Sequence, residues 1–125
     1  MTDLPVRVLV VDDDHDTLAT LVGLLGDEGH EVHACQCAVE VVEAVDEYAP
    51  DVVLLDINMP DINGYDVARE INVRYGRNRP RLIAVTGWQQ AADRVLAYAA
   101  GFDHHVAKPY DVAELLKLVR SREPG

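Results

Sequence analysis

Positive charge is scarce in this 125-residue sequence. Lys and Arg number 11 against 22 Asp and Glu, which gives a formal net charge of −11 at pH 7. Nucleic acids and anionic membrane surfaces bind proteins through basic patches, so we expect neither as a partner. Four arginines do cluster around Pro80, and we interpret them as a solvated helix end and loop: Arg74, Arg77, Arg79 and Arg81.

Cysteines and long apolar runs are also scarce. Cys35 and Cys37 are separated by one residue, which is a poor geometry for a mutual disulfide. A metal site would need more ligands than the nearby His33 adds, so reduced thiols are the favoured interpretation. No basic segment followed by an apolar core opens the chain, and no apolar run is long enough to span a membrane. These features predict a cytoplasmic protein.

The length and composition fit one globular domain. A chain of 125 residues with 49% hydrophobic residues can build its own core. The sequence contains no linker, no low-complexity tract and no change in composition that would mark a second domain. We therefore expect residues 1–125 to form a single domain.

Apolar runs alternate with segments of helical periodicity five times along the chain. The runs predict strands at residues 6–11, 30–35, 52–56, 81–86 and 103–108. The periodic segments predict helices that begin near residues 15, 38, 64, 91 and 111. Alternation of this kind is typical of an α/β fold, with a parallel sheet covered by helices on both faces.

Polar side chains follow the apolar parts of four predicted strands. The strands of a parallel sheet point the same way, so their carboxyl ends share one rim, where ligands bind in open α/β sheets. Each residue alone could be an ordinary cap or surface group, but together they predict a site. The residues expected at this rim are Asp12, Asp13, Asp56, Thr86 and Lys108. Asp14 competes for the acidic pair, although Asp12 and Asp13 follow the apolar run directly.

The chemistry of this set favours phosphoryl transfer. Clustered carboxylates repel one another, and a hard cation such as Mg²⁺ removes the repulsion while it binds carboxylates and a phosphate. Lys108 adds a positive charge and Thr86 a hydroxyl donor for phosphoryl oxygens. Asp56 lies at the end of the most apolar strand, and aspartate can act as a nucleophile that forms an aspartyl phosphate.

Four segments, in this order and spacing, carry a resemblance to a known family: VLVVDD (8–13), LLDINMPDINGYD (54–66), AVTG (84–87) and AGFDHHVAKP (100–109). Essentially the whole chain resembles a two-component response-regulator receiver domain, of the single-domain type found among chemotaxis regulators. The resemblance implies a flavodoxin-like doubly wound sheet with strand order 2-1-3-4-5 and five helices. It also implies a phosphoacceptor signalling domain without an output domain, rather than an enzyme that turns over a substrate.

Residue roles follow from the resemblance. Asp56 is implied as the phosphoacceptor, with the phosphoryl group supplied by a histidine kinase or a phosphotransfer protein. Asp13, Asp56 and the backbone carbonyl of Asn58 would bind Mg²⁺, or Mn²⁺ in its place, with Asp12 acting through water. Thr86 and Lys108 would each contact a phosphoryl oxygen. The Lys108–Pro109 bond would be cis, and the output would pass through the face made by the fourth helix, the fifth strand and the fifth helix.

One position departs from the family pattern. The family usually places Tyr or Phe as a switch residue where this chain has His105. Histidine titrates near neutral pH, so we expect a weaker or differently routed switch. We also hypothesise that Trp88 screens the acyl phosphate from water.

Two other functions remain open at this stage. A phosphatase of the haloacid dehalogenase type uses a similar set, but Asp16 stands where its first motif needs Thr or Val. A receiver-like module that is never phosphorylated would have an incomplete acidic site, and this one is complete.

Overall fold

The computed structural model describes residues 6–37, 40–57, 59, 63–87, 91–108 and 111–120, without side chains for residues 91–94. The described part of the chain contains one parallel sheet of five strands, in the order β2-β1-β3-β4-β5. This order confirms the flavodoxin-like expectation. The strands are β1 (Arg7–Val11), β2 (Glu31–Cys35), β3 (Val52–Asp56), β4 (Arg81–Thr86) and β5 (His104–Ala107).

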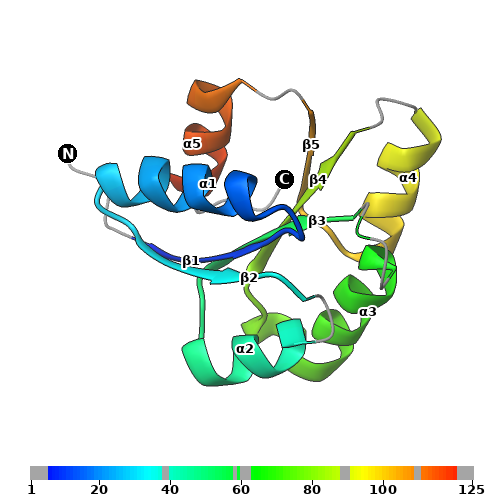
Figure 1. The fold of residues 1–125 in the computed structure, drawn as a ribbon. Coiled ribbons are helices and arrows are strands. Elements are labelled where there is room, and N and C mark those ends of the chain that lie inside the picture. Colours follow the sequence, from blue (N-terminus) through cyan, green and yellow to red (C-terminus); the bar gives the residue numbers. More distant parts are fainter. Residues whose placement is uncertain are drawn as a thin grey trace.

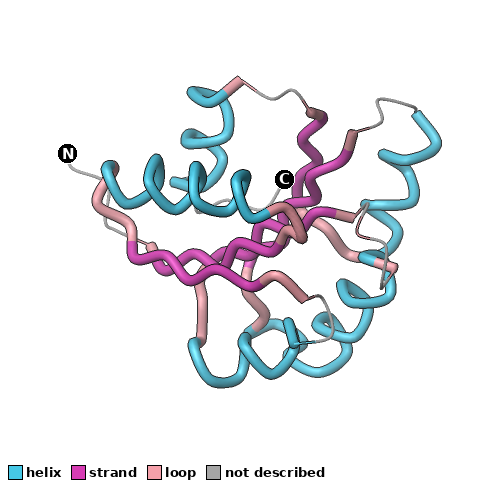
Figure 2. Tube along the Cα trace, in the orientation of Figure 1, coloured by secondary structure: helices cyan, strands magenta, loops and turns pink. Residues whose placement is uncertain are grey.

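Helices cover both faces of the sheet (Figures 1 and 2). The described helices are α1 (His15–Asp27), α2 (Val41–Tyr48), α3 (Gly64–Tyr75), α4 (Ala91–Ala100) and α5 (Val112–Arg120). One hydrophobic cluster joins α1 and α5 to one face of the sheet, and a second joins α2, α3 and α4 to the other. Two consecutive residues of β3 illustrate the division. Leu54 packs in the first cluster and Leu55 in the second, and both are almost fully buried.

Burial of β3 on both faces explains the run of apolar residues that ends in Asp56. Every residue of this strand is buried, as expected for a central parallel strand. Its register pairs Leu55 with Val11 of β1, so Asp12 follows β1 beside the position of Asp56. The sheet itself therefore brings these two carboxylates together.

Capping residues fix the loops around this rim. Asp14 is the N-cap of α1, and its carboxylate accepts the Asp16 N–H at 3.2 Å. Asn63 caps α3 by accepting the Tyr65 N–H at 2.9 Å. A Cβ atom on Gly64 would lie 2.8 Å from Cα of Ile57, so only glycine lets α3 begin this close to the end of β3.

The element ends differ slightly from the sequence prediction. β1 begins at Arg7 rather than residue 6, β2 at Glu31 rather than residue 30, and β5 covers only His104–Ala107, so Lys108 lies one residue beyond its strand. A 3-10 helix at Gly76–Asn78 follows α3 and was not predicted. No described helix combines the length and the apolar character that a membrane span needs.

The interpretation of the arginine cluster as solvated was wrong for two of its members. Arg79 forms a bidentate ion pair with Asp103, with both N···O distances at 2.8 Å. Arg81 donates to the Leu118 and Val119 carbonyls at the end of α5, at 2.9 and 2.7 Å. Both side chains are therefore structural, and they tie the amino end of β4 to its neighbours.

Candidate functional site

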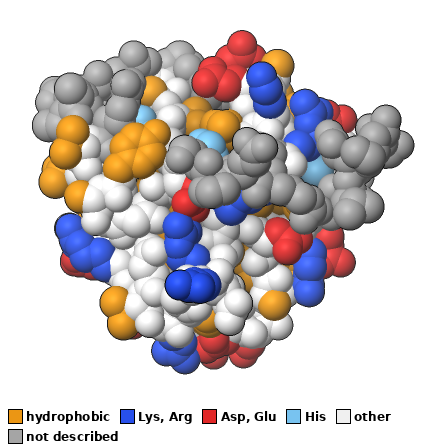
Figure 3. Space-filling model, turned by 180° about the vertical axis from the view of Figure 1, so that it is seen from behind, with side chains coloured by type: hydrophobic (Ala, Val, Ile, Leu, Met, Phe, Trp, Pro, Cys, Tyr) orange, Lys and Arg blue, Asp and Glu red, His pale blue; other side chains and the backbone are white. Residues whose placement is uncertain are grey.

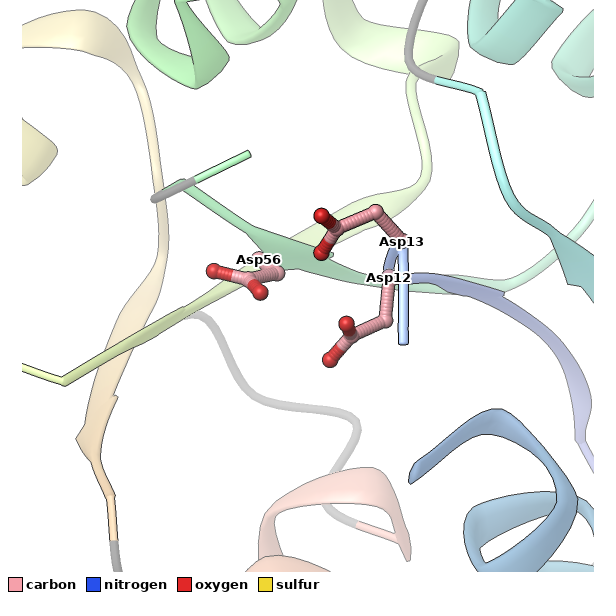
Figure 4. A group of neighbouring side chains, drawn as sticks. All are labelled: Asp12, Asp13 and Asp56. Carbon is pink, nitrogen blue, oxygen red and sulfur yellow. The ribbon is translucent and has the colours of Figure 1, made fainter. Parts of the chain in front are cut away.

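Three carboxylates meet at the carboxyl end of the sheet. One oxygen from each of Asp12, Asp13 and Asp56 lies within 4.8 Å of the others, and no other such cluster of acidic, His or Cys side chains occurs among the described residues. Figure 4 shows the three side chains pointing toward a common space, two from the end of β1 and one from the end of β3. Asp56 is the last residue of its strand, which places the carboxylate at the rim rather than inside the core.

The cluster is largely shielded from water. Asp12 is 3% exposed and Asp56 is 6% exposed, whereas Asp13 is open to solvent. Burial raises the pKa of Asp12, and the negative charge of Asp56 raises it further. The Asp14 N–H, which donates to Asp12 Oδ1 at 2.9 Å, and the Lys108 ammonium partly offset this rise. The site is thus short of positive charge, because one ammonium group faces three carboxylates.

Lys108 supplies that ammonium group from the residue directly after β5. Its Nζ lies 3.3 Å from Asp56 Oδ2 and 3.5 Å from Asp12 Oδ2. Burial would lower the pKa of Lys108, but Asp56 and Asp12 together hold it above its usual value. The side chain is one-third exposed, so the ammonium group is charged and still accessible from solvent.

Thr86 lies on β4, between the strands that lead to Asp56 and Lys108, and His105 lies on β5, the strand that leads to Lys108. Thr86 is the last residue of β4 and is fully buried, and its carbonyl accepts the Lys108 N–H at 2.6 Å. This bond ties the threonine and the lysine together through their backbones. His105 is half-buried on β5 and pairs with Ala84 in the register of β4.

Asp14, the rival candidate for the acidic pair, has another task. Its carboxylate caps α1 and accepts the Thr17 hydroxyl at 2.6 Å, and this bond lowers the pKa of Asp14. The sequence offered Asp14 or Asp16 as the cap of this helix, and the structure selects Asp14. Asp12 accepts the Asp14 N–H, a common turn for an aspartate and the residue two positions later. Three residues named from the sequence, Asn58, Trp88 and Pro109, lie outside the described residues.

The donor set fits a hard divalent cation. Mg²⁺ and Mn²⁺ prefer carboxylate and other oxygen ligands, and the cluster offers three carboxylates with a negative excess. Asp12, Asp13 and Asp56 are the described side chains that would hold such an ion. A cation there would neutralise the repulsion between Asp12 and Asp56, which adds to the effect of burial in raising the pKa of Asp12.

The fold and the site together define a class of protein. A doubly wound sheet in this order, with acidic residues after β1 and at the end of β3 and a lysine after β5, is the arrangement of receiver domains. Residues 8–120 match the family model described as "Response regulator receiver domain". The chain belongs to this family, which confirms the resemblance seen in the sequence.

Curated relatives are response regulators. The chain is 35% identical over 118 residues to "Response regulator MprA" of Mycobacterium sp. (strain KMS), covering 94% of this chain and 50% of that protein. It is 34% identical over 116 residues to "DNA-binding response regulator MtrA" of Mycobacterium tuberculosis (strain CDC 1551 / Oshkosh), covering 93% and 50%. The chain thus spans about half the length of the curated relatives it matches.

Solved receiver domains have the same fold. A signal receiver domain from Bermanella marisrubri superposes with a TM-score of 0.83 at 28% identity, covering 90% of this chain and 93% of that one. A CheY-like receiver domain from Methanospirillum hungatei JF-1 gives 0.82 at 29% identity, covering 93% and 91%. The chemotaxis protein CheY4 of Vibrio cholerae gives 0.85 at 22% identity, covering 93% and 97%, a likeness of fold alone.

Proposed function

We propose that Asp56 accepts a phosphoryl group from the phosphohistidine of a sensor kinase or a phosphotransfer protein. One observation carries the proposal: Asp56 ends the central strand with two carboxylates beside it and the Lys108 ammonium 3.3 Å away. A carboxylate in this setting lies at the rim of the sheet and has a cationic partner for the incoming charge. Membership of the receiver family agrees with this chemistry.

The transfer needs little beyond positioning. An Asp56 oxygen attacks phosphorus in line with the phosphohistidine N–P bond, the O–P bond forms, and the imidazole leaves with the electrons of the N–P bond. Lys108, already between Asp12 and Asp56, pairs with a phosphoryl oxygen. The buried Thr86 hydroxyl at the end of β4 donates to another.

A divalent cation completes the proposed site. Mg²⁺, or Mn²⁺ in its place, would neutralise charge on the carboxylates and on the phosphoryl oxygens when bound. Asp13 and Asp56 would bind it directly and Asp12 through water. The same residues would let the domain lose its phosphoryl group by hydrolysis, so transfer and autodephosphorylation are its only chemistry.

The proposed output face consists of α4, β5 and α5. On α4, Val95 is 66% exposed, and Leu96 and Tyr98 are 47% and 48% exposed. Figure 3, seen from behind, shows hydrophobic side chains gathered on the side where α4 lies. An inward movement of Thr86 on phosphorylation would shift the equilibrium between two conformations of this face. Half-buried His105 is the proposed switch residue.

The proposed setting is the cytoplasm, with proteins as partners. Cys35 and Cys37 are both free thiols, which suits a reducing compartment. The net charge of −11 disfavours direct contact of this domain with nucleic acid. The relative named as DNA-binding is about twice as long as this chain.

Phosphorylation of the isolated chain tests the proposal. Incubation with acetyl phosphate and Mg²⁺, followed by intact mass measurement, should show the addition of one phosphoryl group to the wild-type chain. Asp56→Asn should remove the addition, while Asp66→Asn, which changes an exposed aspartate of α3, should keep it. A wild-type chain that gains no mass, or an Asp56→Asn chain that does, overturns the assignment.

The switch is tested separately. Amide NMR shifts of α4 and β5 should change on phosphorylation of the wild-type chain, and His105→Ala should reduce the change. If the shifts in His105→Ala match those of the wild type, His105 is not part of the switch.

A further inference from the structure

The edge strand β2 lies in an open groove that is separate from the carboxylate cluster. Figure 1 shows β2 between α1 on one side and α2 on the other. The groove is lined by β2 and by the facing sides of both helices, and it encloses about 1480 Å³. This volume exceeds that of an ordinary small-molecule pocket, so the groove suits a segment of polypeptide. Its lining does not include Asp56.

The backbone of β2 offers hydrogen-bonding groups to this groove. The Glu31 N–H donates to the Val6 carbonyl at 3.1 Å, and the Cys35 carbonyl accepts the Asp12 N–H at 3.2 Å. Residues 31, 33 and 35 therefore bond to β1, and strand alternation turns the N–H and C=O groups of Val32 and Ala34 outward. Within the described part of the chain, no other strand pairs with this edge.

Among the described residues, the edge lacks several of the usual protections against strand addition. Natural edge strands are commonly protected by Lys, Pro, a β-bulge or a covering segment. The sequence EVHAC has neither Lys nor Pro, and its pairing with β1 runs without a bulge over five residues. His33 and Ala34 are exposed, and Glu31 is held at the strand start by Arg7, with N···O 3.0 Å. A further strand could therefore pair here without displacing any described element.

One wall of the groove is acidic. Glu40, Glu43 and Glu47 line it at and along α2, and none of them has an ion pair with another described residue. Arg7, the single Lys or Arg among the described lining residues, is already bound to Glu31 and lies over the Tyr48 ring, 4.4 Å from its centroid. The groove therefore has an excess of negative charge, which favours a basic occupant.

The same charge argues against a second copy of this chain as the occupant. Two β2 edges that pair antiparallel about a two-fold axis keep α2 of both copies on the same face of the joined sheet. Glu43 and Glu47 of one copy would then approach those of the other, and each chain carries a net charge of −11. Like charges brought together in this way oppose association.

We propose that the β2 edge binds an extended basic segment of a partner protein, which adds to the sheet as a sixth strand. Backbone hydrogen bonds to Val32 and Ala34 would hold the segment, and its Lys or Arg side chains would face Glu43 and Glu47 of α2. The surface is independent of the proposed phosphoryl transfer at Asp56.

A peptide titration tests the proposal. The probe is a short, alternating Lys-Val peptide added to the ¹⁵N-labelled wild-type chain, and the readout is the change in amide NMR shifts. The largest changes should fall at Val32, Ala34 and their neighbours. A peptide of the same sequence with alternate backbone nitrogens methylated keeps the charge but loses the hydrogen bonds, and it should not bind at β2.

Paired variants test the acidic wall. Glu43→Gln with Glu47→Gln should weaken binding of the Lys-Val peptide about fivefold, the effect of two lost exposed ion pairs. The matched control, Glu70→Gln with Glu114→Gln, makes the same change of charge on exposed residues of α3 and α5 and should leave the affinity unchanged.

Four outcomes would overturn the proposal: shift changes that avoid β2, equal binding of the methylated peptide, equal weakening by the control variant, or a lack of binding by the parent peptide. A dimer in sedimentation experiments that the peptide fails to dissociate would show instead that a second copy occupies the edge.

Discussion

The two ends of the sheet both contain a buried aspartate, but the surroundings act on it in opposite directions. At the carboxyl end, burial and the charge of Asp56 raise the pKa of Asp12. At the amino end, burial alone would raise the pKa of Asp103, but Arg79 and the Leu82 N–H outweigh it and the pKa is lowered. The Asp103 carboxylate accepts from both terminal nitrogens of Arg79 at 2.8 Å and from Leu82 N–H at 2.9 Å.

The difference indicates that the amino end of the sheet stabilises the fold, whereas the carboxyl end can bind ligands. Asp103 has its hydrogen-bond partners within the protein, so its charge is balanced without any ligand. The cluster of Asp12, Asp13 and Asp56 has an excess of negative charge, and Lys108 Nζ lies 3.3 Å from Asp56 and 3.5 Å from Asp12. Such an imbalance costs stability in the free protein, and it leaves coordination capacity for a cation and a phosphoryl group.

The largest effect is expected at the amino end. Asp103→Asn leaves the partly buried Arg79 guanidinium without a counter-charge, and it should lower the free energy of unfolding by about 3 kcal/mol. Urea unfolding measures the change. Asp66→Asn, the same substitution in the exposed pair with Arg69, is the control and should cost less than about 1 kcal/mol. Equal effects of the two substitutions would show that burial of the Arg79 pair is unimportant.

The cost of Asp103→Asn should depend on pH. The pKa of Asp103 is lower in the folded chain than its unfolded value near 3.8, so the native state holds its proton less tightly. The stability from this carboxylate is therefore fully present above the unfolded pKa and is lost as the pH falls through the folded pKa. Urea unfolding of the wild-type and Asp103→Asn chains should be measured from pH 7 to pH 3. The difference between their free energies of unfolding should be smaller at pH 3 than at pH 7. A difference that grows toward acid would contradict the lowered pKa.

A change of opposite sign is expected at the carboxyl end. Asp56→Asn removes one of three crowded charges, and without divalent cations it should raise the free energy of unfolding by about 1 kcal/mol. Urea unfolding in the presence of a chelator measures this, with the wild-type chain as reference. A loss of stability would mean that the contact between Asp56 and Lys108 outweighs the repulsion.

A gain of similar size is expected from a bound cation. Mg²⁺ at about five times its dissociation constant should stabilise the wild-type chain by about 1 kcal/mol, because it binds only the folded state. Asp103→Asn should keep this gain and Asp56→Asn should lose most of it, as measured by the midpoint of thermal unfolding. A gain that is the same in all three chains would place the bound cation elsewhere.

The sequence was most informative where the fold allows only one arrangement of the site residues. Once β1 and β3 are parallel neighbours, Asp12 and Asp56 must end side by side, and Lys108 must lie near the same rim. The strand order itself came from the family resemblance, and the structure confirms it. The direction of the strands alone puts these residues on one rim, and the strand order makes Asp12 and Asp56 neighbours on it.

The sequence was least informative where a contact depends on details of register and turn. Arg79 and Asp103 are 24 residues apart with no shared periodicity, and their pairing depends on how β4 and β5 begin. Asp14 follows two other aspartates in the sequence. It differs from them because its backbone N–H donates to Asp12 and its carboxylate caps α1. Local patterns contain no information about the pairing of Arg79 with Asp103, whereas for Asp14 they offered a helix cap as one alternative.

Gly64 makes α3 a mechanical neighbour of the reactive strand. Because a single Cβ atom there would already press against the backbone of Ile57, the start of the helix and the residue after Asp56 have no compressible space between them. An inward displacement of α3 must push the end of β3, and a shift of Ile57 toward the helix must move the helix start. A movement of the end of β3 toward the helix would therefore press Ile57 directly against the start of α3.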